Sequence, residues 1–255
     1  MMEDIKMPII RKKHQDKTSH NEWKRLLTND SPFAVKEAYV KLRTNMMFSL
    51  ASDGEKPCQV FCITSPSESE GKSLTSANIA ISFAMLGKRT LLIDADMRRP
   101  TQNKLWKLKS ESGLSSILAR VDSCDVFDIE GLPLSIICAG NTPPNPSELL
   151  SSANMSKLID GLREQYDYII IDTPPINTVA DAQILSRVVD STVMVCRSGN
   201  TKNTELHNAL DLVERSNGNV CGIVLNNLNM KSSKYSYHYK YGYGKNKEYV
   251  SRYGE

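Results

Sequence analysis

The amino-acid sequence predicts an α/β fold in which helices flank a mainly parallel β-sheet. Two observations favour this class. Six short apolar runs, typical of strands buried on both faces of a sheet, recur along the chain. Segments with helical periodicity separate them. The 255 residues suit one large α/β domain, and the 40% of hydrophobic residues is enough for a core.

The elements are expected in a regular order after a polar start. Residues 1–30 lack clear periodicity, and we expect a flexible segment there. A helix is expected over 31–50, since Ser31 can cap it, Pro32 suits a first helical position and apolar residues recur at 35, 39, 42 and 46. The apolar runs predict strands at 59–64, 90–96, 134–140, 166–175, 191–197 and 219–227. Helices are expected between them at 72–86, 101–108, 113–120, 147–164, 180–187 and 201–216.

Composition narrows the possible classes of protein. No stretch approaches the roughly 18 uninterrupted apolar residues that a membrane helix needs. The N-terminus has acids and lacks the apolar segment of a signal peptide. The six cysteines form no C-x-x-C pair, so we interpret them as reduced core residues rather than as metal ligands or disulfides. These features favour a cytoplasmic protein.

The last 21 residues have an unusual composition. They hold seven of the ten tyrosines of the chain. Residues 231–255 carry a charge of +4, while the body between residues 26 and 231 carries −4. We expect one folded domain over 31–230 and a disordered tail over 231–255, because the tail lacks the apolar surface to fold alone. An edge strand, given the alternation of tyrosines, and a stacking surface for single-stranded nucleic acid are alternatives.

A loop with the sequence SPSESEGKS lies between the strand at 59–64 and the helix at 72–86. In this context the GKS triplet indicates a P-loop, in which backbone N–H groups and the positive end of the helix hold phosphate oxygens. Lys72 would contact the β- and γ-phosphates, and Ser73 would bind Mg²⁺. Two positions depart from the usual pattern: Pro66 stands at the first glycine, and Ser69 stands where related loops often have another.

Three aspartates follow apolar strands. Asp94 and Asp96 end LLIDAD, and Asp172 ends YIIID. Ligands of open parallel α/β sheets bind outside the carboxyl ends of the strands, so these side chains should lie beside the P-loop. Each aspartate alone could be a helix cap or a turn former. Three of them in one P-loop chain favour Mg²⁺-dependent nucleotide chemistry.

The combination resembles the bacterial tyrosine kinases, P-loop proteins related to the MinD and ParA ATPases. The stretch ITS…EGKS resembles their Walker A motif. LLIDADMR resembles their D-x-D-x-R motif with Arg98 as the arginine, and YIIIDTPP resembles their Walker B motif. The segment AGNTPPNPSELL and the tyrosine-rich C-terminus also resemble the family. The similarity runs from about residue 31 to the end.

The resemblance implies an ATP- and Mg²⁺-dependent protein-tyrosine kinase that autophosphorylates the tail of a neighbouring subunit. Positioning and charge neutralisation supply most of the catalysis in such a transfer. Asp96 and Asp172 would position Mg²⁺ with Ser73, Asp94 would accept the tyrosine proton, and Asn226 would lie near the adenine. The loop residues that would bind nucleotide are Ser69, Glu70, Gly71, Lys72, Ser73 and Leu74. The acceptor tyrosines would be Tyr235, Tyr237, Tyr239, Tyr241, Tyr243, Tyr249 and Tyr253.

The charge of the tail suits this role. A basic tail would be drawn to an acidic, phosphate-bearing site. Each phosphotyrosine adds roughly −1.5 to −2 charges, so three of them would outweigh the +4 of the tail. We expect phosphorylation to reverse the attraction and to loosen the contacts between subunits.

The resemblance also implies partners. The chain resembles the split form of Gram-positive bacteria, in which a separate transmembrane activator of the polysaccharide co-polymerase type recruits the kinase to the inner face of the membrane. The implied role is in capsular or extracellular polysaccharide synthesis or export. A homo-oligomer, with a ring as one arrangement, and a cognate tyrosine phosphatase are expected, and no nucleic acid. The ring motif E-x-x-R-x-x-R is incomplete, because Glu37 and Arg43 are present but Val40 replaces the first arginine.

A MinD- or ParA-like switch ATPase is the main alternative function. Those proteins carry an additional signature lysine in the P-loop, and Ser67 stands at that position here. An iron–sulfur carrier of the same fold would need the C-x-x-C pair that this chain lacks. A regulatory adaptor whose tail is modified by another kinase is a third possibility, and substitution of Lys72 would separate it from a self-modifying kinase.

Overall fold

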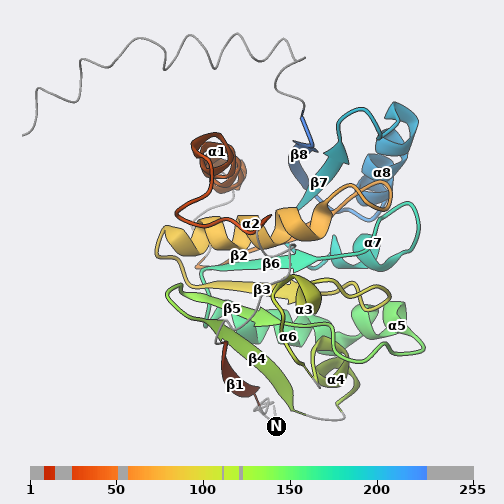
Figure 1. Cartoon of the computed structure of the whole chain (residues 1–255). Helices are drawn as coiled ribbons and strands as arrows, with labels where there is room; N and C mark the ends of the chain where they lie inside the picture. The colour runs from red at the N-terminus through yellow and green to blue at the C-terminus, as the bar shows by residue number, and fades with distance from the viewer. Residues whose placement is uncertain (1–8, 15–24, 51–56, 111, 121–122, 229–255) are drawn as a thin grey trace, which may run out of the picture.

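In a computed structural model, helices cover both faces of a single sheet (Figure 1). The structure describes residues 9–14, 25–50, 57–110, 112–120 and 123–228. Within these residues the strand order is β1-β4-β5-β3-β6-β2-β7-β8. Every neighbouring pair is parallel except β4 and β5. The predicted class, a mainly parallel sheet flanked by helices, is therefore confirmed.

The centre of the sheet consists of strands that the apolar runs predict. Alternate residues of each strand pack against opposite helical layers, which is why these strands read as nearly continuous apolar runs. The predicted strands are observed as β2 (Gln59–Thr64), β3 (Thr90–Asp94), β5 (Leu134–Ile137), β6 (Tyr168–Asp172), β7 (Ser191–Arg197) and β8 (Val220–Asn226).

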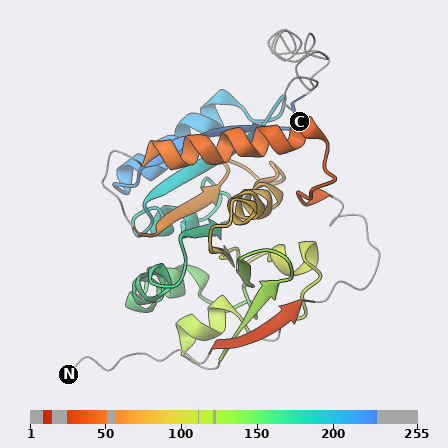
Figure 2. The same cartoon turned by 90° about the vertical axis from the view of Figure 1, so that its left-hand side faces the viewer.

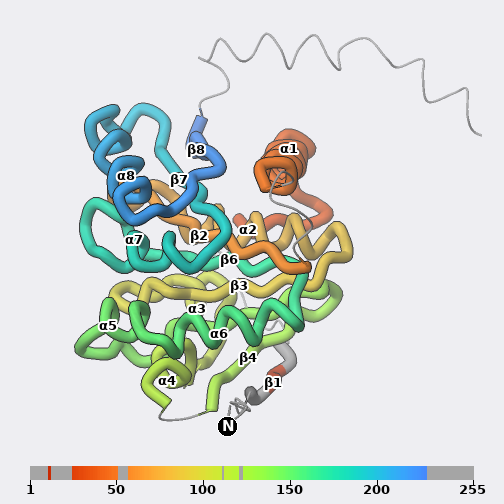
Figure 3. The backbone as a smooth tube through the Cα atoms, turned by 180° about the vertical axis from the view of Figure 1, so that it is seen from behind, coloured from red at the N-terminus to blue at the C-terminus, as the bar shows by residue number. Residues whose placement is uncertain are grey.

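Two layers of helices enclose these strands. The first layer consists of α1 (Phe33–Ser49), α2 (Lys72–Met85) and α3 (Gln102–Leu105), and α2 is buried over most of its length. The second layer, seen from behind in Figure 3, consists of α4 (Leu114–Ala119), α5 (Pro146–Ser151), α6 (Ala153–Arg163), α7 (Asp181–Leu185) and α8 (Asn203–Arg215). In Figure 2, α1 runs alongside β8 at one edge of the sheet.

Two strands lie outside the predicted set. β4 (Cys124–Ile129) runs antiparallel to β5, and β1 (Ile9–His14) lies parallel to β4 at the edge of the sheet. The expectation that all of residues 1–30 form a flexible segment is therefore wrong for β1. Charge accounts for its position, since Lys12 Nζ lies 2.8 Å from Asp125 Oδ1. The basic strand β1, which lacks apolar periodicity, thus pairs with β4, which carries acidic residues.

The helix expected over 147–164 is two helices. Ser152 separates α5 from α6 with an extended backbone, φ −70° and ψ 154°. The hydroxyl of Ser152 donates to the carbonyl of Leu149 at 2.7 Å, a local bond that competes with continued helical pairing. The apolar positions on both sides of the break continue to face the core, which is why the periodicity alone did not reveal it.

The start of α1 also differs from the prediction. The helix begins after Pro32, and the Ser31 hydroxyl does not cap it but accepts a hydrogen bond from the Thr28 N–H at 2.9 Å. Val35 is 40% exposed, whereas Tyr39, Leu42 and Met46 pack against the core. The buried stripe of α1 therefore starts one turn later than its apolar spacing predicts.

Some expectations lie beyond the described residues. The seven tyrosines and the boundary at residue 231 fall there, so the tail stays a prediction. None of the helices that the structure describes is long and apolar enough to cross a membrane.

The burial of the cysteines generates a testable prediction. Five of them are buried free thiols and Cys221 is half-buried. Burial raises the pKa of Cys58 to about 11 and that of Cys62 to about 12, so little reactive thiolate exists at pH 8. Burial raises the pKa of Cys221 as well, but its partial exposure admits a reagent, so we expect Cys221 to be labelled faster than the five buried cysteines in the native protein and all six to be labelled after denaturation, as counted by mass spectrometry. Rapid native labelling of Cys58 would contradict this, and Cys221→Ser should remove the fast phase.

Candidate active site

The site forms where β2, β3 and β6 end at one edge of the sheet. Asp94 of β3 lies directly opposite Asp172 of β6, and Ile63 of β2 also pairs with Asp172. Both aspartates are fully buried. Two adjacent buried carboxylates are costly unless donors or cations compensate them, and the residues around them supply this compensation.

Asp94 organises the loop that follows β3. Its carboxylate accepts backbone N–H bonds from Asp96 at 3.1 Å, Thr101 at 3.0 Å and Gln102 at 2.9 Å. Burial raises the pKa of Asp94 and the charge of Asp172 adds to the shift, while the N–H groups of Gln102 and Thr101 oppose it. The loop over residues 95–102 is therefore fixed by one enclosed side chain.

Asp172 is held by groups that no motif marked. Ser76 Oγ donates to Asp172 Oδ1 at 3.2 Å, and Gln102 Nε2 donates to Asp172 Oδ2 at 2.8 Å and to the Ser73 carbonyl at 3.0 Å. Trp106 Nε1 donates to Gln102 Oε1 at 3.1 Å and so fixes the amide. Burial raises the pKa of Asp172, and the charge of Lys72 opposes the shift. Gln102 thus connects the Walker B aspartate to the P-loop backbone.

The P-loop has the backbone expected of a phosphate-binding turn. Ser69 (φ 62°) and Gly71 (φ 90°) both lie in the left-handed region, which explains why related loops have glycine at position 69. Asn226 Nδ2 donates to the Glu70 carbonyl at 3.0 Å, so the end of β8 is attached to the loop. The Glu70 side chain is itself buried, and burial raises the pKa of its carboxyl.

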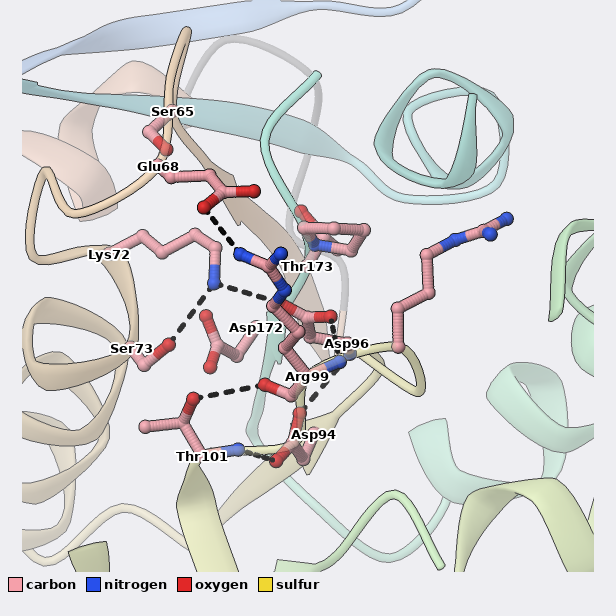
Figure 4. Close-up of polar contacts among 12 residues, drawn as sticks. Ser65, Glu68, Lys72, Ser73, Asp94, Asp96, Arg99, Thr101, Asp172 and Thr173 are labelled. Carbon is pink, nitrogen blue, oxygen red and sulfur yellow. Dashed lines mark hydrogen bonds and ion pairs between the residues drawn. The ribbon is translucent and has the colours of Figure 1, made fainter. Parts of the chain in front are cut away.

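Lys72 points from the start of α2 into the site (Figure 4). Its Nζ lies 3.0 Å from Asp96 Oδ2 and 3.3 Å from Ser73 Oγ. Burial acts to lower the pKa of Lys72, but the charges of Asp172 and Asp96 outweigh it and the pKa is raised. The lysine is therefore a full positive charge at the place where the P-loop would hold phosphates.

A cleft of about 510 Å³ opens over these residues, a size typical of small-molecule sites. Asp94 and Asp172 are enclosed beneath its floor, whereas Asp96 faces it. Its lining carries four bases and two acids, so the cleft suits an anionic ligand. The residues that line it are Arg25, Glu68, Ser69, Gly71, Lys72, Ser73, Leu74, Asp96, Arg98, Arg99, Thr101, Leu105, Pro175 and Thr178.

Arg98 connects the loop after β3 to the second helical layer. Its Nε donates to Asp181 Oδ2 at 2.9 Å and its Nη2 donates to Asp181 Oδ1 at 3.2 Å, and the Ser147 hydroxyl reaches the same oxygen at 2.5 Å. Ser147 belongs to the NPSELL segment that the sequence singled out. The arginine of the D-x-D-x-R motif therefore has a structural partner on α7.

The two residues of the incomplete ring motif lie away from the cleft, on α1. Arg43 Nη1 donates to the Ser82 carbonyl of α2 at 2.5 Å, and Glu37 is half-buried. Arg43 therefore makes a contact within the chain that attaches α1 to α2. Its predicted part in oligomerisation stays a prediction.

The donor set fits Mg²⁺. In the described residues no three acidic, histidine or cysteine side chains converge as a complete metal site. Mg²⁺ nevertheless prefers one or two carboxylates supplemented by phosphate oxygens and water, and Asp96 and Ser73 both line the cleft.

Comparison with known proteins decides the family. The ParA model, described as an NUBPL iron-transfer P-loop NTPase, matches residues 58–254. The putative tyrosine-protein kinase CapB of Staphylococcus aureus is 40% identical over 216 residues, which cover 82% of this chain and 92% of that protein. The chain belongs to the bacterial tyrosine-protein kinases. The tyrosine-protein kinase YwqD of Bacillus subtilis (strain 168) is 39% identical to this kinase over 202 residues, covering 78% of the chain and 83% of YwqD.

Solved structures agree with this assignment. The chimerical protein CapA2B2 matches the kinase with a TM-score of 0.75 at 35% identity, over 87% of this chain and 95% of that one. The kinase domain of Escherichia coli ETK matches with a TM-score of 0.74 at 30% identity, over 83% of this chain and 82% of that one. The cell division ATPase MinD of Pyrococcus furiosus matches with a TM-score of 0.57 at 16% identity, over 66% of this chain and 71% of that one. At this identity the match shows a shared fold alone.

The contact between Gly71 and Asn226 generates a prediction. A Cβ at Gly71 would lie 2.1 Å from Asn226 Nδ2, whereas a Cβ at Gly87 would meet nothing within 4 Å. Both glycines have positive φ, so the two alanine substitutions share the backbone strain. The Asn226 amide can turn away only by giving up its bond to the Glu70 carbonyl, so we expect Gly71→Ala to lower nucleotide affinity up to about tenfold and Gly87→Ala to leave it unchanged, as measured by calorimetric titration. Equal losses in both variants would contradict a specific clash at the P-loop.

Proposed function

We propose that this kinase autophosphorylates the tyrosine cluster of its C-terminal tail in trans, with ATP as the donor, and thereby regulates capsular or extracellular polysaccharide synthesis or export. The observation that carries the proposal is that one chain of the kinase family combines a phosphate-binding cleft around Lys72 with seven tyrosines in its last 21 residues. The tail of a second copy of the chain can therefore serve as the substrate.

The charge of the cleft determines the order of binding in this proposal. The sequence led us to expect an acidic site that attracts the tail, but the cleft is lined by more bases than acids. The phosphates of the bound nucleotide must therefore supply the negative charge that attracts a tail of charge +4. Nucleotide binding would therefore precede docking of the tail.

The side chains would divide the work of phosphoryl transfer. Lys72 would hold the β- and γ-phosphates, and Ser73 and Asp96 would hold Mg²⁺, with Asp172 one layer behind them. The metal, when bound, supplies charge neutralisation on the phosphates. Asp94 is proposed to accept the tyrosine proton. Its burial supports basicity through a raised pKa, but its three N–H contacts must open for a hydroxyl to reach it.

Partners are proposed at the exposed apolar surface of α1 and β8. Phe48 is 73% exposed and Ile223 is 50% exposed, and large apolar patches on soluble proteins mark contact sites. A neighbouring subunit, which Glu37 and Arg43 would help to place, and the cytoplasmic segment of a transmembrane activator are the proposed occupants. A cognate phosphatase would reverse the modification.

Phosphorylation of the tail is expected to release subunits, which sedimentation of the phosphorylated and unphosphorylated proteins would detect. Equal sedimentation of the two forms would contradict this release.

A mixing experiment tests transfer in trans. One chain carries Lys72→Ala with an intact tail, and the other keeps Lys72 but has its seven tail tyrosines changed to phenylalanine. We expect phosphotyrosine on the tail of the Lys72→Ala chain only when both chains are present, detected by phosphopeptide mass spectrometry. Both would be expressed in the native host without the chromosomal copy, so that an activator is present. No phosphate in the mixture, with phosphate in wild type, would indicate transfer within one chain.

A pH profile tests the role of Asp94. The ionised carboxylate is the base, so kcat of the wild type should rise as the pH rises through the raised pKa of Asp94. We expect Asp94→Asn to lower kcat about 100-fold or more and to remove this rise. Asp96→Asn should instead weaken the dependence of binding on Mg²⁺. A normal pH profile in Asp94→Asn, together with a lowered Tm, would show that Asp94 serves only to hold the loop.

A further inference from the structure

Two consecutive arginines follow Asp96, and they have different environments. Arg98 is paired with Asp181, whose side chain is fully buried, and this pair fixes its position. Arg99 has a side chain that is 74% exposed, and its Nη1 lies 2.5 Å from Glu68 Oε2 of the P-loop. Arg99 is therefore the arginine whose guanidinium can move within the cleft.

The backbone of Arg99 is nevertheless fixed beside the phosphate site. Its N–H donates to Asp96 Oδ1 at 3.0 Å, while the other oxygen of Asp96 lies 3.0 Å from Lys72 Nζ. One carboxylate thus connects the arginine backbone to the P-loop lysine. Figure 4 shows the Arg99 side chain reaching back from the loop after β3 toward the P-loop, on the side from which Lys72 enters.

Glu68 is an unusual neighbour for a phosphate site. A carboxylate at the mouth of the cleft repels an anionic ligand unless a cation neutralises it, and Arg99 is the cation in contact with it. The Glu68 side chain is 52% exposed, and ion pairs this exposed are weak. A terminal phosphate carries more charge than a carboxylate and matches the planar donor fork of arginine. It can therefore compete successfully for Arg99.

We propose that Arg99 leaves Glu68 when ATP binds and donates hydrogen bonds to the terminal phosphate, so that the Glu68–Arg99 pair sets the preference of the cleft for ATP over ADP. Glu68 acts as an internal competitor that occupies Arg99 until a triphosphate displaces it. ADP lacks the phosphate that Arg99 would contact, so the diphosphate leaves the pair closed. Product release is then favoured by closure of the same pair.

Dissociation constants for a non-hydrolysable ATP analogue and for ADP, each with Mg²⁺, test this proposal in the full-length chain by calorimetry. Arg99→Ala should weaken binding of the ATP analogue about tenfold more than binding of ADP, because both anions then meet an uncompensated Glu68 but only the ATP analogue also loses a hydrogen bond to a charged group. Glu68→Gln should tighten binding of the ATP analogue a few-fold, because it removes the competitor.

The double variant Glu68→Gln/Arg99→Ala separates two explanations. If Arg99 contacts the terminal phosphate, the double variant recovers only the part of the binding that Glu68 repels and stays weaker than wild type for the ATP analogue. Recovery to the wild-type constant would show that Arg99 only neutralises Glu68, and it would overturn the proposal. Equal weakening of ADP and the ATP analogue by Arg99→Ala would overturn it as well.

A matched control removes another exposed arginine pair. Arg89 Nη2 lies 2.7 Å from Asp167 Oδ1, and neither residue lines the cleft. Arg89→Ala should leave both dissociation constants unchanged, and thermal unfolding should confirm that every variant is folded. Because the readout is binding, the result does not depend on whether the tail is phosphorylated in trans.

Discussion

The site depends on one constraint, the placement of Asp94 opposite Asp172 on adjacent strands. Two fully buried carboxylates must each receive hydrogen bonds, and the surrounding chain is shaped by that need. The loop after β3 curves so that three of its N–H groups reach Asp94, and Gln102 at its end reaches Asp172. The same curvature brings Asp96 into contact with Lys72. The phosphate site is therefore a consequence of how the sheet compensates its own buried charge.

The central fold could be predicted because the central strands are buried on both faces and contain almost only apolar residues. The strands β1 and β4, toward one edge of the sheet, could not be predicted in this way. β4 interrupts its apolar residues with Asp125 and Asp128, and β1 has four consecutive basic and polar positions after two isoleucines. These strands are stabilised by contacts between distant segments, such as Lys12 with Asp125. Local periodicity carries no signal of such contacts.

The site shows the same division. The motifs mark Lys72, Ser73 and Asp96, which all line one cleft, and motifs could mark them because strand ends and a glycine loop are local features. Gln102 and Glu68 could not be found in this way, because their roles arise only when the loop after β3 meets the P-loop. Asn226 was expected near an adenine on family resemblance. The structure adds a role that the resemblance did not include, a bond to the Glu70 carbonyl.

The two edges of the sheet differ as aggregation risks. β1 carries Arg11 and Lys12, basic residues of the kind that natural edge strands use against pairing with other molecules. β8 contains no charged residue, and its Ile223 and Leu225 are 50% and 47% exposed. Repulsion between like charges therefore opposes strand pairing between molecules at β1 but not at β8. Concentrated solutions of this chain should self-associate first along β8, and raising the salt concentration should not prevent it, because the contact is apolar rather than ionic.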